Sequence, residues 1–196
     1  MKPFLTLILG CCLVLSIFGC EGSSAPASGE PASGKSASEK LAIPPSPILT
    51  PLGNSGVTSE PPVKNFVFGQ AIYVPAYSFI YHGSGDRYLL SITLSIRNTS
   101  STDVILVRSV QYFNSAGALE AQFASGSLRL APMATAEFFI PEHDPIGGSG
   151  ANFVVEWVSE KEKVSQPIIE AVMISTRSQQ GISFLSTGRV IGELRP

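Results

Sequence analysis

The feature that most constrains the fold is a strict alternation of apolar and polar residues in RYLLSITLSIRNTS, residues 87–100. An apolar set alternates with a mostly polar set; the first is Tyr88, Leu90, Ile92, Leu94 and Ile96, and the second is Leu89, Ser91, Thr93, Ser95 and Arg97. Successive side chains of a strand point to opposite faces of its sheet. The period of two therefore predicts a half-buried strand, which ends in a polar turn at residues 98–101.

The rest of the chain from residue 64 onward follows the same rhythm of short apolar segments and polar turns. The further segments are 69–81, 103–113, 118–123, 127–130, 135–140, 151–158, 167–175, and GISFL with GRVI near the end. No window longer than about ten residues favours the helical period of 3.6. About seven to nine short strands without intervening helices predict an all-β fold, an antiparallel β-sandwich of immunoglobulin or fibronectin type.

Two residues suggest where their segments lie in this sandwich. Pro75 has no N–H group to donate to a neighbouring strand, so it predicts an edge strand or a bulge. Trp157 is the single tryptophan, and it shares one face of its segment with Phe153 and Val155. We expect it to be the central aromatic residue of the core.

The N-terminus carries an apolar run from Phe4 to Phe18 after one basic residue, Lys2. A transmembrane helix needs roughly twenty apolar residues, so this shorter run is typical of an export signal. Ile17-Phe18-Gly19-Cys20 resembles the lipobox of bacterial lipoproteins, in which the cysteine receives the lipid. We expect residues 1–19 to be a signal peptide and Cys20 to be acylated; the alternative is a secretory signal that is cut elsewhere.

These features predict a location in the bacterial cell envelope, with the domain outside the cytoplasm and a lipid anchor in either the inner or the outer membrane. Cys11 and Cys12 would leave with the signal, so thiol chemistry, disulfides and cysteine-based metal sites are not expected in the mature domain. Residues 20–63 are rich in Ser, Ala, Gly and Pro and predict a disordered linker after the acylated cysteine. Residues 64–196 would then form one domain.

The charge balance argues against one class of partner. The chain has 13 Lys and Arg residues against 15 Asp and Glu residues, a formal net charge of −2. Nucleic-acid binding needs a basic surface, and the sequence has no excess of basic residues to form one. We therefore expect no nucleic-acid partner.

The glycine-rich stretch at 147–151 invites three catalytic interpretations, and each lacks its required context. A phosphate loop would need a Lys-Ser/Thr pair and a following helix. A dinucleotide fingerprint would need Gly or Ala where Phe153 stands. A nucleophile elbow would place Ser149 at the centre, but its histidine should follow in the chain, whereas both His82 and His143 precede it.

Two polar clusters remain as candidate ligand sites. Glu142-His143-Asp144 offers oxygen and nitrogen ligands for a divalent metal, with His82 as a further ligand, but a polar turn before Pro145 is the simpler interpretation. The second cluster, residues 175–181, contains Arg177, which is suited to carboxylate or phosphate recognition. It either lines a ligand site or forms a solvated hairpin loop. If a site exists, we expect His143, Asp144 and Arg177 to face the ligand together.

Four motifs carry a resemblance to a known family: GQAIYVPAYSFIY, LSITLSIRNTS, GGSGANFVVEW and EAVMISTRSQQGISFLSTGRVI. In order and wording they resemble the bacterial domain-of-unknown-function family 3124, over roughly residues 66–192. The resemblance implies one exported, often lipid-anchored domain. It implies no catalytic residue, cofactor or partner.

The sequence therefore does not reveal a biochemical activity, and we expect a lipoprotein that is not an enzyme and that needs no metal or other cofactor. Its β-sandwich would bind an envelope protein or a glycan. Two alternatives stay open: an envelope hydrolase or metal-dependent enzyme that uses the 142–149 loop, and a structural component of an envelope complex.

Overall fold

The computed structural model describes residues 51–122, 126–177 and 180–196. Within these ranges the chain forms fourteen strands and no helix, and every strand pairing is antiparallel. The predicted all-β sandwich is confirmed, although the described residues form more strands than the seven to nine that the sequence predicted. The signal peptide, Cys20 and most of the predicted linker lie outside the described residues.

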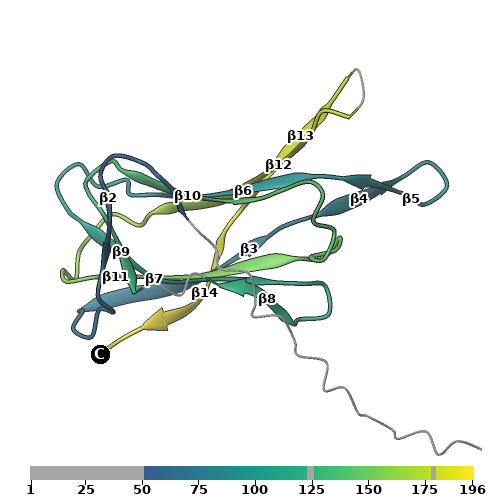
Figure 1. The fold of residues 1–196 in the computed structure, drawn as a ribbon. Coiled ribbons are helices and arrows are strands. Elements are labelled where there is room, and N and C mark those ends of the chain that lie inside the picture. The colour runs from purple at the N-terminus through teal and green to yellow at the C-terminus, as the bar shows by residue number, and fades with distance from the viewer. Residues whose placement is uncertain (1–50, 123–125, 178–179) are drawn as a thin grey trace, which may run out of the picture. The chain divides into compact units, whose positions relative to one another are not determined.

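One layer is a five-stranded sheet in the order β1, β10, β6, β12, β13 (Figure 1). Its strands are β1 (Pro51–Leu52), β10 (Thr135–Ile140), β6 (Ser91–Arg97), β12 (Ile168–Ser175) and β13 (Ile182–Thr187). Strand β6 is the predicted alternating strand, and its apolar residues Ile92, Leu94 and Ile96 are fully buried. The period of two thus identified both the strand and the face that it buries.

The other layer is a seven-stranded sheet in the order β14, β3, β11, β7, β9, β2, with β8 also paired to β7. Its strands are β14 (Arg189–Leu194), β3 (Phe68–Pro75), β11 (Asn152–Ser159), β7 (Ile105–Phe113), β9 (Ser127–Leu130), β2 (Val57–Glu60) and β8 (Leu119–Gln122). Figure 1 shows this sheet as a second layer that faces the five-stranded sheet. Strands β13 and β14 are consecutive, so the chain crosses from one sheet to the other at Gly188.

The core fills the space between the two sheets, and Trp157 lies within it as predicted. Its side chain is fully buried, and its ring meets that of Phe68 edge to face at 5.8 Å between centroids. The other large buried side chains come from both layers and include Tyr112, Phe138, Phe153, Leu128, Leu130 and Met173. Burying a side chain of this size contributes roughly 1.5–3 kcal/mol, so this apolar core is the main source of stability for a domain without disulfides.

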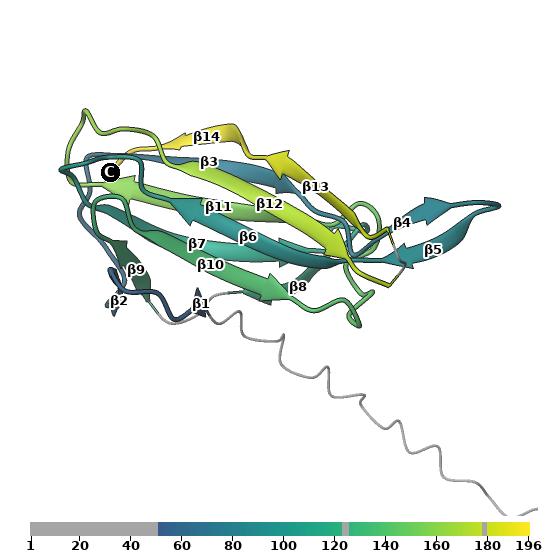
Figure 2. The same ribbon diagram turned by 90° about the horizontal axis from the view of Figure 1, so that it is seen from above.

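Strands β4 (Phe79–His82) and β5 (Asp86–Leu89) form a separate two-stranded sheet. Figures 1 and 2 both show this hairpin extending past the ends of the larger sheets. Its turn contains Gly83 and Gly85, whose φ angles of 53° and 108° lie in the left-handed region that favours glycine. The predicted segment 69–81 is therefore two strands, β3 and β4, in different sheets.

Two details of the sequence-based predictions are wrong. The predicted linker boundary at residue 63 is too late, because β1 pairs with β10 and β2 pairs with β9. Such short edge strands are held by backbone hydrogen bonds and need no apolar periodicity. Pro75 does not mark an edge strand, since β3 has neighbours on both sides; instead Pro75 is the last residue of β3.

Candidate functional site

Three turns and residues 175–177 lie at the same end of the two sheets, and we call this the hairpin end. The turns are the β4–β5 turn, the 114–118 turn and the 141–151 loop. The loop is tied to its neighbours by backbone bonds of 2.9 Å, from Ser78 N–H to Gly148 O and from Ser115 N–H to Gly147 O. The glycine-rich loop is therefore fixed to the base of the hairpin.

The first glycine of this loop packs against a buried pair of hydroxyl groups. Ser78 Oγ and Tyr112 Oη lie 2.8 Å apart in a hydrogen bond, and both side chains are buried. A Cβ at Gly147 would lie 1.8 Å from Tyr112 Oη, far inside van der Waals contact. Position 147 therefore requires glycine for close packing rather than for phosphate binding.

The remaining glycines of the loop surround Ser115, from the 114–118 turn. Ser115 Oγ donates to Gly147 O at 3.0 Å and accepts from Gly150 N–H at 2.8 Å. Gly148 has a φ of 81°, which an L residue rarely adopts. The stretch is a tight backbone passage that leads into strand β11.

The buried hydroxyl of Tyr112 stays protonated over the physiological range. Burial raises the pKa of Tyr112 to about 12, although the hydrogen bond with Ser78 acts in the opposite direction. Negative charge on Asp144 and Glu120 adds to the increase. At neutral pH this group is therefore a hydrogen-bonding partner within the hairpin end.

Arg177 reaches the 141–151 loop, but its partner there is Glu142. Arg177 Nε lies 2.6 Å from Glu142 Oε1, and Ser175 Oγ donates to the same oxygen at 2.9 Å. The Arg177 side chain remains 57% exposed. Arg177 therefore lies beside the 141–151 loop, and the ion pair joins strand β12 to that loop.

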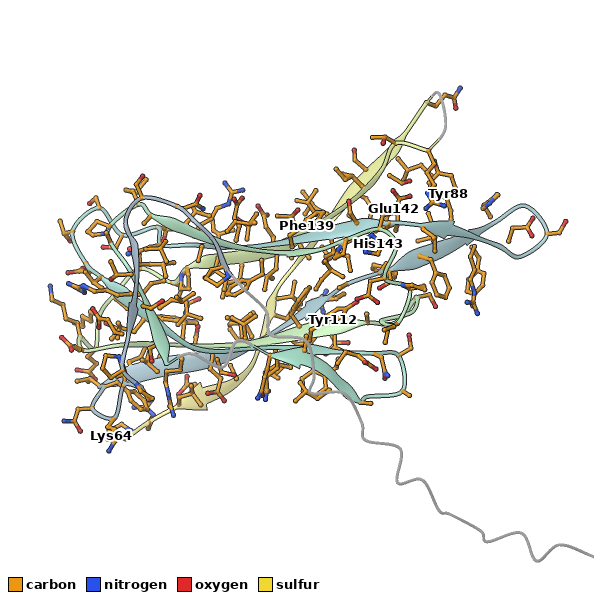
Figure 3. The ribbon with its side chains drawn as sticks, in the orientation of Figure 1. Lys64, Tyr88, Tyr112, Phe139, Glu142 and His143 are labelled. Atoms are coloured by element: carbon orange, nitrogen blue, oxygen red, sulfur yellow. The ribbon has the colours of Figure 1, made fainter. Side chains whose placement is uncertain are left out.

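The other two candidate residues lie on the loop itself. Asp144 Oδ1 accepts from Ile146 N–H at 3.1 Å, which is the Asx turn expected for an aspartate before proline. His143 is exposed to solvent. Figure 3 shows His143 and Glu142 near each other at the hairpin end.

His82 lies on the β4–β5 hairpin, where its ring meets that of Tyr88 edge to face at 5.6 Å. In the part of the chain that the structure describes, no group of three or more His, Cys, Asp or Glu residues is placed to hold a metal ion. Ser178 and Gln179 of the second polar cluster lie outside the described residues.

The opposite end of the sheets carries a surface pocket, and we call it the charged end. The pocket has a volume of about 240 Å³ and is lined by Glu60, Thr102, Asp103, Val104, Leu106, Arg129, Ser159, Glu160 and Lys161. Arg129 Nε lies 3.5 Å from Glu60 Oε1, and Lys161 pairs with Asp103. The hydrogen bond from Lys161 holds the pKa of Asp103 below its ordinary value.

The outer face of the five-stranded sheet carries an apolar row. The strand registers place Phe139, Thr93, Val172 and Leu185 side by side across β10, β6, β12 and β13. Phe139 is 46% exposed and Leu185 is 59% exposed. Its neighbours Phe138 and Ile140 in the strand are buried, so Phe139 lies on the side of the sheet that faces away from the core. The exposed Phe139 and Leu185 lie at the two ends of the row, and the half-buried Thr93 and Val172 lie between them. A row of this kind across one sheet face is a candidate interaction surface.

Sequence reasoning missed the Glu142–Arg177 pair as a pair, the charged-end pocket and the apolar row. The sequence shows opposite charges at positions 142 and 177. No rule of sequence spacing predicts a contact between two residues that are brought together only by the pairing of strands. The pocket residues come from several separate segments. The row could be found only after the strand registers were known, because register decides which outward residues are neighbours.

In the described residues, no helix is long and apolar enough to cross a membrane.

A family model described as "Protein of unknown function (DUF3124)" matches residues 69–191. The chain therefore belongs to this family, and the resemblance noted in the sequence is confirmed. No curated protein and no solved structure matches the chain significantly.

Proposed function

We propose that this member of the DUF3124 family is a lipid-anchored protein of the bacterial cell envelope whose β-sandwich is a non-catalytic binding module. The anchor would be the acylated Cys20, with the domain on the periplasmic or cell-surface side of either membrane. The partner would be an envelope protein or a glycan. The apolar row Phe139–Thr93–Val172–Leu185 carries the binding part of this proposal and favours a protein partner.

The polar groups of the 141–151 loop bond to other parts of the protein. This structural role supports the proposal that the domain is a binding module and not an enzyme. Glu142 is bound to Arg177 and Ser175, and Asp144 caps the backbone of its own turn. Ser115 bonds to the backbone at Gly147 and Gly150. Catalytic acids and nucleophiles instead bond to a base or to a substrate.

The anchor is tested by fractionating cells that express the full chain with Cys20→Ser. Lipid chains hold a protein on a membrane through buried methylene groups, so the variant should move from the membrane to the soluble fraction. Wild-type protein in the same cells is the control. A variant that stays with membranes through high salt would overturn the lipoprotein assignment.

The binding module is tested with a photocrosslinking residue at position 139 in intact cells. We expect a discrete protein adduct at 139 and none from a matched probe at Ser101, an exposed residue at the charged end. Phe139→Asp, with the probe moved to Leu185, should abolish the adduct while the domain stays folded. Absence of any adduct from the row would overturn the proposed binding surface.

The enzymatic alternative, which uses the 142–149 loop with His82, predicts that a divalent metal stabilises the protein. A thermal-shift series on the Cys20→Ser full chain, with and without chelator, checks this. A metal-dependent rise in Tm that disappears in His143→Ala would favour the metal-dependent enzyme over the binding module. If the protein is instead a structural component of an envelope complex, photocrosslinking probes on several faces of the domain should each give an adduct.

A further inference from the structure

We propose that strand β13 pairs with β13 of a second copy of this chain, so that the five-stranded sheet continues across a two-fold axis at Leu185. The proposal goes beyond the function proposed above and depends on neither the lipid anchor nor the envelope partner. Its basis is the open edge of β13, the direction of the backbone groups along that edge, and the side chains that the edge exposes.

Strand β13 is an edge strand without the usual protection against further pairing. In the described residues it pairs with β12 and with no other strand, and that register is regular along its whole length. Figure 2 shows β13 at the outer edge of its layer. Edge strands are normally protected by charged side chains, prolines, bulges or shortness. Residues 182–187, ISFLST, have none of these, so this edge is open to another strand.

The other edges of the two larger sheets are protected in these ways. Strand β14 carries Arg189 and Glu193, and its pairing has a bulge between Val190 and Gly192. Strands β2 and β8 have four residues each, and each carries a glutamate. Strand β1 has two residues. Among the described edges of these sheets, β13 is therefore the one suited to pairing.

The backbone of β13 directs three residues toward the open edge. Gly188 N–H donates to Ile169 O at 2.8 Å, so these two residues form a hydrogen-bonded pair at the end of the β12–β13 ladder. Hydrogen-bonded and non-hydrogen-bonded pairs alternate along an antiparallel ladder. Thr187, Leu185 and Ser183 therefore belong to non-hydrogen-bonded pairs with β12. Their N–H and C=O groups point away from β12, toward the open edge.

One symmetric register satisfies all of these groups within the strand. Two antiparallel copies of β13 centred on Leu185 place Leu185 opposite its own copy and Ser183 opposite Thr187 of the other copy. Each of the three residues then exchanges N–H and C=O hydrogen bonds with the residue opposite. Moving the centre by one residue in either direction would leave one of the three opposite a position outside β13.

The same register matches the exposed side chains. Ser183, Leu185 and Thr187 are exposed on the outer face, and Leu185 is 59% exposed. In the pair, the two Leu185 side chains meet at the axis, and the hydroxyl groups of Ser183 and Thr187 lie opposite each other on both sides of it. Cross-strand pairs of this kind stabilise a sheet. The apolar row would then continue from Leu185 into the row of the second copy.

The inner face of β13 is fixed to the rest of the domain. The Phe184 ring meets that of Tyr77 edge to face at 5.7 Å between centroids, and Ser186 Oγ donates to Pro75 O. A slip of one residue against β12 would break both contacts. The strand therefore presents its edge already formed, and a second copy supplies both the backbone partner and the apolar side chain that this edge needs.

The test is disulfide formation between cysteines on β13, in intact cells that express the full chain. Opposite residues of a hydrogen-bonded pair have Cα atoms about 5.5 Å apart, within the range of roughly 4.4–6.8 Å that a disulfide bridges. Leu185→Cys should therefore link to its own copy under mild oxidation. We expect a band at twice the mass of the chain, at least about fivefold stronger than in the wild type, whose native cysteines set the baseline.

The neighbouring positions test the register. Ser183→Cys alone and Thr187→Cys alone should not exceed the baseline, because each residue lies roughly 13 Å along the strand from its own copy. Co-expressed chains with one variant each should link to each other. Equal linkage by the single variants and by Leu185→Cys would overturn the proposed pairing. Linkage of Leu185→Cys to a different protein, or to none, would overturn it as well.

Sedimentation of the Cys20→Ser full chain measures association in solution. We expect a dimer, and Leu185→Lys should raise its Kd by at least about tenfold because two like charges would lie opposite each other. Val190→Lys is the matched control, since Val190 is 49% exposed on the edge strand β14. Urea unfolding checks that both variants are folded. A chain that stays monomeric, or a Leu185→Lys variant that dimerises as the wild type does, would overturn the proposal.

These outcomes are distinct from those that test the proposed function. A photocrosslinking probe at Leu185 should also give an adduct at twice the mass of the chain, and Phe139→Asp should leave that adduct in place. The adduct with an envelope protein should disappear in the same variant. Loss of the dimer with a retained adduct at position 139 would refute the two-fold pairing alone.

Discussion

The two ends of the sandwich differ in what they expose and in what holds them together. The hairpin end exposes the apolar surface of Tyr81 and Ile146 beside the charged Arg87 and Arg177, whereas the charged end exposes mainly ionic side chains, among them Glu60, Lys161 and Arg129. The same strands run through both ends, so the core does not impose this difference. The turns impose it, and the two ends can therefore serve different partners on one scaffold.

Each end also contains buried polar side chains that fix its turns. At the hairpin end these form the Ser78–Tyr112 hydroxyl pair against Gly147. At the charged end they include Asn98, whose side chain is 2% exposed. Its amide group donates to the carbonyls of Asp103, Leu130 and Ala131 at 2.7, 3.2 and 3.0 Å and accepts from Ser100 N–H at 3.0 Å.

The largest expected effect is that of Gly147→Ala at the hairpin end. The new Cβ would lie 1.8 Å from Tyr112 Oη and 2.6 Å from Ser78 Oγ, so the loop or the ring must shift. Overpacking of this kind destabilises by about 3 kcal/mol. Urea unfolding of the Cys20→Ser full chain measures it. Gly53→Ala is the control, because nothing lies within 4 Å of the Cβ that it would add, and equal effects of the two would contradict the packing argument.

Asn98→Ala should have the next largest effect and act at the charged end. It leaves three backbone carbonyls and one N–H group without their side-chain partner, and we expect a loss of about 2 kcal/mol in unfolding free energy. The matched variant at the hairpin end is Asn114→Ala. Asn114 accepts from Ala116 and Ala118 N–H in an exposed turn, where water can replace it. If Asn114→Ala destabilised as much as Asn98→Ala, burial would not explain the role of Asn98.

These residues show how far the sequence predicts the structure. The alternation around Ile92 and the placement of Trp157 depend on the period of a single strand, so both were predictable. The buried role of Asn98 was not, because a polar residue after a strand has the same local pattern whether its amide faces water or backbone. Deciding between them requires the carbonyls of residues 130 and 131, about thirty positions away.

The candidate site also has one part that the sequence predicted and one part that it did not. A polar turn at Asp144 was predicted from its own neighbours, and the structure contains an Asx turn there. The pairing of Arg177 with Glu142 required the registers of two strands, which sequence patterns leave open. Local chemistry was therefore predictable, and contacts between hairpins were not.

Tyr112→Phe separates the hydrogen bond at the hairpin end from the packing around it. At pH 7 the loss should be about 1 kcal/mol, because Ser78 loses its partner. The pKa of Tyr112 is about 12 in the folded protein against a reference value of 10.0. The raised pKa of Tyr112 therefore stabilises the wild-type fold fully below pH 10. This contribution, on the order of 2–3 kcal/mol, is lost as the pH rises toward 12.

The variant cannot lose that contribution, so its stability should overtake that of the wild type at strongly alkaline pH. Urea unfolding at pH 7, 10 and 11.5 checks this reversal. Tyr81→Phe is the matched control, because the Tyr81 side chain is 58% exposed whereas that of Tyr112 is buried. Parallel profiles for wild type and Tyr112→Phe would contradict the assigned pKa.

The smallest effect on stability should come from the ion pair at the charged end. Lys161 is 66% exposed at its side chain, and water and salt screen its attraction to Asp103. In Lys161→Ala the pKa of Asp103 should rise toward 3.8, because the largest cause of its lowering is the hydrogen bond from Lys161. The unfolding free energy at pH 7 should change by less than the uncertainty of urea unfolding.

Carboxyl NMR titration measures the pKa, and Lys163→Ala, two residues along the same exposed run, is the matched control. A depressed folded pKa stabilises above the unfolded pKa, and this contribution is lost as pH falls through the folded value. Because the pair is exposed, that loss should be visible in the titration but not in unfolding. If Lys161→Ala destabilised the domain as strongly as Asn98→Ala, the surface charges would hold this end together. The charged end would then not be a solvated surface around a pocket, and its contrast with the hairpin end would disappear.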